Sequence, residues 1–262
     1  MTASGAPSVI GGLLLFGAAA VGGAINSVAG GGSFVAFPAL LFAGVPAVPA
    51  NATNTVALWP GSVASAIAYR SELRQVRRKL LPLGVAALIG GLAGALLLLR
   101  TSDTLFVRLI PGLLLFATLV FSFGARIGKW LAGNPDADAP SRTSIPLAFV
   151  AQLLISVYGG YFGGGMGIMM LAVLSVLGMR DIHEMNGVKN VLATLINGVA
   201  VVSFIVAGAV DWPPAVVMIA GGIAGGYVGA RIARRVTPIV VRRIVLGIAW
   251  SMTAYFFLKT YA

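Results

Sequence analysis

The chain has 262 residues, of which 58% are hydrophobic and only 10% are charged, whereas a soluble domain carries about 25% charged residues. The formal charge of +11 comes from Lys and Arg in short loops beside apolar stretches, where juxtamembrane anchors stand. This pattern excludes an ordinary soluble fold and argues against nucleic-acid binding. Because the chain has no cysteine, it has no disulfides, thiolate metal sites or cysteine nucleophile.

Apolar runs between charged or Pro-rich breaks predict ten helical segments. They cover 8–29, 33–45, 53–69, 80–99, 104–123, 144–162, 166–178, 188–208, 213–230 and 238–258. The first lacks the positively charged start of a signal peptide, so we expect it to be retained. Two others, 33–45 and 166–178, are too short to cross a bilayer. We therefore expect an all-α integral membrane protein with two short, broken or re-entrant helices.

The two short segments each follow a glycine triplet, at 30–32 and 163–165. A shift from 30 to 163 superposes the triplets, and a shift of two residues more superposes Asn51 on Asn186. The sequence therefore contains an internal repeat. Because each half holds an odd number of segments, the halves must run oppositely through the bilayer.

The predicted organisation is two inverted five-segment repeats, 1–127 and 144–262, joined by a cytoplasmic linker at 128–143. Basic residues follow the third segment of the first half but the fourth segment of the second half. The positive-inside rule then places these loops in the cytoplasm and both termini outside the cell membrane. The same basic loops are expected to contact anionic lipids at the cytoplasmic face.

The acidic residues all fall in or beside predicted loops. Their absence from mid-membrane positions argues against cation transport and against a carboxylate proton relay. The only histidine, His183, stands near Asp181 and Glu184, which is more typical of a polar turn than of a metal site. We expect no metal, no cofactor and no enzymatic activity.

The glycine triplets are the first candidate binding elements. Broken backbone at membrane depth must be buried in protein or line a wet cavity, and a helix that restarts there directs free N–H groups at an anion. The expected donors are Gly30, Gly31, Gly32, Ser33, Gly163, Gly164 and Gly165. Glycines can alternatively serve close helix packing, which is the role we favour for the stripes at 90–94 and 221–229.

A polar segment follows each short helix, at 50–55 and 185–190. Its amides and hydroxyls could cap the next helix, or they could face a substrate. Lys189 could reach the cytoplasmic interface, or it could bind an anion in the cavity. Ser62 and Asn197 are candidate cavity walls. The candidate side-chain ligands are Asn51, Thr53, Asn54, Asn186, Lys189 and Asn190.

The motifs at 26–33, 38–41, 50–54 and 163–167 make the chain resemble the sulfite exporter TauE/SafE family, also called TSUP, over nearly its whole length. The segment at 186–190 matches more loosely. The resemblance implies secondary transport of sulfite, sulfonates or related small organosulfur anions, with alternating access as our hypothesis. An anion channel and a non-transporting membrane accessory subunit remain alternatives. The glycine stripes are compatible with a homodimer as well as with packing inside one chain.

Overall fold

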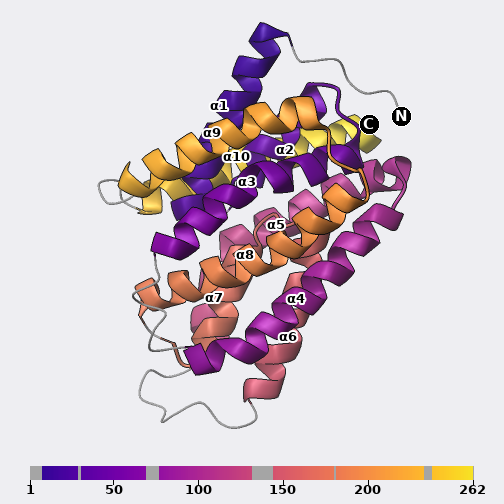
Figure 1. The fold of residues 1–262 in the computed structure, drawn as a ribbon. Helices are drawn as coiled ribbons and strands as arrows, with labels where there is room; N and C mark the ends of the chain where they lie inside the picture. Colours follow the sequence, from indigo (N-terminus) through magenta and orange to yellow (C-terminus); the bar gives the residue numbers. More distant parts are fainter. Residues whose placement is uncertain are drawn as a thin grey trace.

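The computed structural model describes residues 8–28, 31–68, 77–131, 144–179, 181–232 and 238–261, and within these ranges the chain is α-helical without strands (Figure 1). The helices are α1 (Val9–Val28), α2 (Ser33–Phe42), α3 (Ala47–Ala68), α4 (Arg77–Arg100), α5 (Asp103–Leu131), α6 (Ser144–Tyr161), α7 (Met166–Val176), α8 (Ile182–Val206), α9 (Trp212–Ile232) and α10 (Pro238–Tyr261). The predicted all-α fold is confirmed, and both short segments are short helices.

The predicted starts of the third and eighth segments are wrong. Helix α3 begins at Ala47 instead of 53, and α8 begins at Ile182 instead of 188. In the first turn of α3, the Val48 N–H has no partner within the helix and donates instead to the Asp103 carboxylate, at 2.8 Å. The polar segments at 50–55 and 185–190 therefore lie inside helices, and their interpretation as helix caps is wrong.

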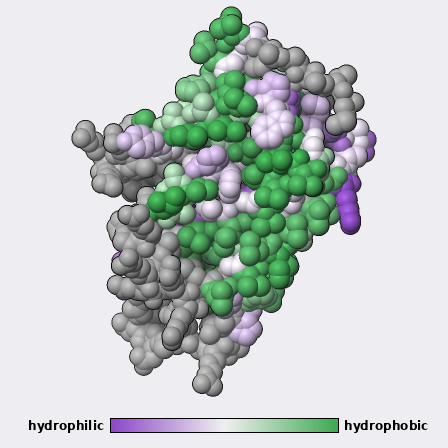
Figure 2. Space-filling model, in the orientation of Figure 1, coloured by the Kyte–Doolittle hydropathy of each residue, from purple (hydrophilic) through white to green (hydrophobic). Residues whose placement is uncertain are grey.

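The protein is a multi-pass integral membrane protein. Among the described residues, five helices are long and apolar enough to cross a membrane. Large apolar side chains remain exposed on them, including Leu13, Leu97, Val202 and Leu258. Figure 2 shows apolar residues over most of the described surface on the visible face. Such a surface requires lipid as its solvent. The five spans are Val9–Asn26, Leu81–Arg100, Asp103–Gly124, Glu184–Val206 and Arg242–Tyr261.

The two halves of the chain interlock through their fourth helices. Helix α4 of the first half packs along α6 and α8 of the second half, and α9 of the second half packs along α1 and α3 of the first (Figure 1). Helices α3 and α8 contact each other between these pairs. The division at 128–143 stays a prediction: α5 continues to Leu131, and 132–143 lie outside the described residues.

The glycine stripes pack helices closely, as expected. A Cβ atom on Gly90 would lie 2.6 Å from the Leu153 carbonyl oxygen, so α4 and α6 meet backbone to backbone. In the second stripe, a Cβ atom on Gly225 would clash with the Ala20 carbonyl oxygen, so α9 and α1 also meet backbone to backbone. Small residues of this kind allow close approach in a membrane. The two seams hold α4 and α9 on either side of the crossing between α3 and α8.

Candidate functional site

Both glycine triplets interrupt the backbone at the ends of α1 and α6. Gly31 has φ of 130°, and Gly163 and Gly165 have φ of 81° and 76°. Positive φ is easily adopted only by glycine, which explains the residue type at these positions. Gly30, the first residue of the first triplet, lies outside the described residues.

Each break is fixed by a side chain from the helix that precedes it. The Asn26 Oδ1 accepts a hydrogen bond from the Gly31 N–H, at 3.3 Å. The Tyr158 hydroxyl donates to the Gly164 carbonyl, at 2.7 Å. The two interactions differ in chemistry, and each links the last turns of a long helix to the break that follows it.

The starts of α2 and α7 have no side-chain caps, because their N-cap residues are Gly32 and Gly165. Backbone carbonyls of the breaks accept hydrogen bonds from some of the first N–H groups, as Gly31 does from Phe34 and Gly163 from Met166. The start of each helix still carries a partial positive charge. Gly31 and Gly167 border the same cavity. Both helix starts therefore lie at one space inside the protein.

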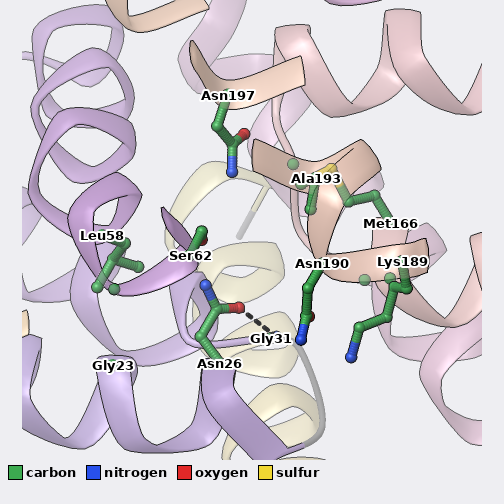
Figure 3. A pocket seen from close by; sticks show the side chains of 14 residues that line it. Gly23, Asn26, Gly31, Leu58, Ser62, Met166, Lys189, Asn190, Ala193 and Asn197 are labelled. Carbon is green, nitrogen blue, oxygen red and sulfur yellow. Dashed lines mark hydrogen bonds between the residues drawn. The ribbon is translucent and has the colours of Figure 1, made fainter. Parts of the chain in front are cut away.

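That space has two lobes. The Lys189 lobe has a volume of about 40 Å³ and is lined by both breaks and by polar side chains of α1, α3 and α8, as Figure 3 shows. The Asn54 lobe has a volume of about 30 Å³ and includes Ser33 and Thr55. Each lobe exceeds the 10–15 Å³ that one water needs. The lobes share six lining residues, Asn26, Gly31, Leu58, Gly163, Met166 and Asn197.

Helices α3 and α8 contribute equivalent positions to this cavity. The cavity-lining positions of α3 include 54, 55, 58 and 62, and those of α8 include 189, 190, 193 and 197. Each position of α8 follows its counterpart by 135 residues, the offset found between Asn51 and Asn186. The spacing places each set on one face of a helix. Ser62 and Asn197 thus form cavity walls, as expected.

Lys189 is the charged group of this cavity. Its side chain is only 4% exposed, and its Nζ donates to the Asn186 Oδ1, at 3.0 Å. Its stem packs against Gly167, where a Cβ atom would lie 3.3 Å from the Lys189 Cδ. No acidic residue lines either lobe in the described part of the chain. Lys189 therefore lies against the cavity instead of reaching the membrane surface.

Two buried amides of the cavity have an unused hydrogen-bonding atom. The Asn190 Nδ2 has no partner in the described structure, although the residue is only 5% exposed. Asn54 is only 1% exposed; its Nδ2 donates to the Ser33 Oγ, at 3.1 Å, while its Oδ1 has no partner. Unsatisfied buried polar atoms are costly, so each amide has an interaction to offer a ligand.

The remaining predicted residues serve the scaffold. The Asn51 Nδ2 donates to the Tyr161 carbonyl, at 2.9 Å. The Thr53 Oγ1 accepts from the Asp211 N–H, at 2.9 Å, just before α9 begins. Gly32 packs against the Gly22 carbonyl, and Asn186 reaches the cavity only through Lys189. Of the predicted set, the structure brings together at the cavity Gly31, Ser33, Asn54, Gly163, Gly165, Lys189 and Asn190.

Asn26 is the main cavity residue that sequence reasoning did not select. It lines both lobes and fixes the first break through its Oδ1, which leaves its Nδ2 as a donor toward the cavity (Figure 3). The sequence signal was its place five residues before Gly31. The apolar members Leu58 and Ala193 could have been found from the helical spacing between Asn54 and Ser62 and between Lys189 and Asn197.

Several bacterial proteins are similar over most of the chain. A probable membrane transporter protein of Haemophilus influenzae is 27% identical, covering 92% of each chain. The probable membrane transporter protein ORF9 of a Sinorhizobium species is 31% identical, covering 84% of this chain and 82% of its own. YfcA of Escherichia coli K12, also described as a probable membrane transporter protein, is 27% identical, covering 92% and 87%.

No solved structure matches the chain significantly. The sequence pattern of the family described as sulfite exporter TauE/SafE matches residues 15–256. Because this match covers nearly the whole chain, the protein belongs to the sulfite exporter TauE/SafE family of membrane transporters.

Proposed function

We propose that this membrane transporter carries sulfite, sulfonate or related small organosulfur anions across the cell membrane by alternating access. The observation that carries the proposal is the buried Lys189, which faces a cavity without an acidic residue among its described lining. A buried charge without a countercharge is unfavourable. An anion in the cavity would offset that cost.

The neutral groups around Lys189 also favour an anion. The Asn190 Nδ2 offers a free donor, and the uncapped starts of α2 and α7 add partial positive charge. The Coulomb attraction between Lys189 and one negative charge at a distance of 4 Å is about 4 kcal/mol at the effective dielectric constant typical of protein sites. A single cation supported by neutral donors suits an anion of low charge that must also leave the site.

The small volume of the lobes, about 40 and about 30 Å³, favours a small cargo. Sulfite and short sulfonates are compact oxyanions whose oxygens accept several hydrogen bonds. The polar lining also favours transport over the role of an accessory subunit, for which a dry interior would be expected. The small volume of the described cavity also favours a carrier over a continuously open channel.

Alternating access is supported by the equivalence of the two halves. Helices α3 and α8 cross with opposite chain directions (Figure 1) and contribute equivalent positions to the cavity. We propose that the halves are inverted repeats that rock about this crossing, which opens the site to either side in turn. In this arrangement both termini lie outside, and the basic loops meet anionic lipids at the cytoplasmic face.

Counterflow in proteoliposomes tests the proposal. Vesicles loaded with unlabelled sulfite or methanesulfonate should accumulate the labelled anion transiently, with saturable kinetics. Lys189→Ala should abolish this counterflow, whereas Lys259→Ala, an exposed residue at the end of α10, should preserve it. Flux that does not saturate and shows no counterflow would indicate a channel. If vesicles containing folded protein take up neither anion, the proposal fails.

A further inference from the structure

The two lobes of the cavity differ in the buried polar atom that each leaves without a partner. In the Lys189 lobe, the unused buried atom is a donor, the Asn190 Nδ2. In the Asn54 lobe, the unused buried atom is an acceptor, the Asn54 Oδ1. An anion whose oxygens only accept hydrogen bonds would satisfy the first atom and leave the second without a partner.

The Asn54 amide is anchored by the Ser33 hydroxyl. Its Nδ2 donates to the Ser33 Oγ, at 3.1 Å, so the Oδ1 is the atom left over. The neighbouring Thr55 hydroxyl donates to the Asn51 carbonyl, at 2.9 Å, and is therefore committed as a donor within its own helix. The lobe thus presents one unpaired acceptor, the Asn54 Oδ1, beside the start of α2.

We infer that the cavity selects an oxyanion that still carries its own O–H group. This inference rests on the proposed function and names the protonation state of the cargo. The negative oxygens face Lys189 and Asn190, and the O–H group donates to the Asn54 Oδ1. A hydrogen oxyanion such as hydrogen sulfite satisfies both unused atoms, whereas the sulfite dianion and methanesulfonate satisfy only the donors.

The selection also supplies a means of proton movement. Lys189 is the only titratable residue among the described residues that line the two lobes, which come from α1, α2, α3, α7, α8 and the breaks. No carboxylate in that lining could relay a proton. A proton that travels on the cargo crosses together with the anion, and one negative charge moves for each anion carried.

A comparison of the transport rates of two anions of similar size tests the inference. Proteoliposomes with the full chain receive labelled sulfite or methanesulfonate at external pH values on either side of neutrality. The sulfite rate should follow the concentration of hydrogen sulfite, while the methanesulfonate rate, which reports titration of the protein itself, should change less than about twofold. Dependence on total sulfite or on the dianion would overturn the inference.

Substitution of Asn54 provides a second readout. In the wild type we expect a preference for hydrogen sulfite over methanesulfonate of about tenfold, which is the effect of about 1.4 kcal/mol, within the range of one unsatisfied buried polar atom. In Asn54→Leu this ratio should fall to about one. Ser33→Ala keeps the acceptor but releases the amide, so its ratio should lie between the two.

The outcomes separate the two proposals. Counterflow of both anions with a ratio near one in the wild type, or a ratio that Asn54→Leu leaves unchanged, overturns the selection and leaves the anion carrier intact. Absence of counterflow for both anions in the wild type removes the proposed function as well. If Asn54→Leu does not elute as a folded protein in detergent, the pH dependence of the wild type decides alone.

Discussion

The break between α1 and α2 and the break between α6 and α7 each lead from a long helix into a short one, but they differ in backbone and in chemistry. Gly32 has φ of −56°, whereas Gly165, at the matching position, has φ of 76°. The short helices then end alike: Val45 N–H donates to the Leu40 carbonyl, and Met179 N–H donates to the Leu174 carbonyl, each after a glycine of positive φ. The two short helices are therefore alike where they end and different where they begin.

The chemistry differs at one pair of equivalent positions. Position 54 of α3 holds an asparagine bound to Ser33, and the matching position 189 of α8 holds a buried lysine. Matching positions of α3 and α8 thus differ in charge. The comparison teaches that a single difference between the halves places the positive charge of the cavity on the α8 side.

The largest effect should come from removing the charge. Lys189→Met keeps much of the apolar stem but removes the cation, so anion uptake should fall about 100-fold, because loss of one member of a buried charge interaction costs roughly 2–5 kcal/mol. Initial rates of anion uptake into proteoliposomes measure this fall. Asn54→Met is the matched variant in the other half; an equal loss in both would show that the halves contribute the same chemistry.

Backbone conformation at the breaks should have the next largest effect. Gly165→Ala places a Cβ on a residue with φ of 76°, and its Cβ would lie 3.2 Å from the Ala117 carbonyl oxygen. The left-handed conformation alone costs about 1–2 kcal/mol, so thermal unfolding in detergent should occur at lower temperature. Gly112→Ala, within α5 and with open space around it, is the control and should not destabilise.

The side chains that fix the breaks should have the smallest effects. Tyr158→Phe removes the hydrogen bond to the Gly164 carbonyl, which is worth about 1 kcal/mol. Uptake should therefore fall about fivefold, or the temperature of thermal unfolding should fall slightly. Asn26→Leu removes the corresponding interaction in the first half and also a cavity donor. A weaker effect for Asn26→Leu than for Tyr158→Phe would contradict its assignment to the cavity.

Much of the fold follows from the sequence, because apolar runs and glycine triplets are local features. The starts of α3 and α8 did not follow, because Asn51 and Asn186 resemble capping residues. The first turn of α3 is satisfied partly by Asp103, a residue far away in the sequence that accepts from the Val48 N–H. The close packing of α1 on α9 brings together segments far apart in the sequence. Local patterns contain no information about such pairing.

The candidate site could be predicted by residue type more readily than by role. Lys189, Asn190 and Asn54 line the cavity. Asn51 and Thr53, which lie in the same polar segment as Asn54, instead bind the Tyr161 carbonyl and the Asp211 N–H. The difference depends on which way each side chain points from its helix. It also depends on which backbone groups of distant segments happen to face it.

The interlocking of α4 and α9 has a consequence for biosynthesis. When the first half has left the ribosome, the glycine seam of α4 has no partner, because α6 and α8 have not yet been made. Likewise, α1 and α3 lack their packing partner until α9, the second-last described helix in the chain, has been synthesised. Most of the native interior can therefore form only after the whole chain has been inserted, and the nascent first half must persist in the bilayer as separate, incompletely packed helices.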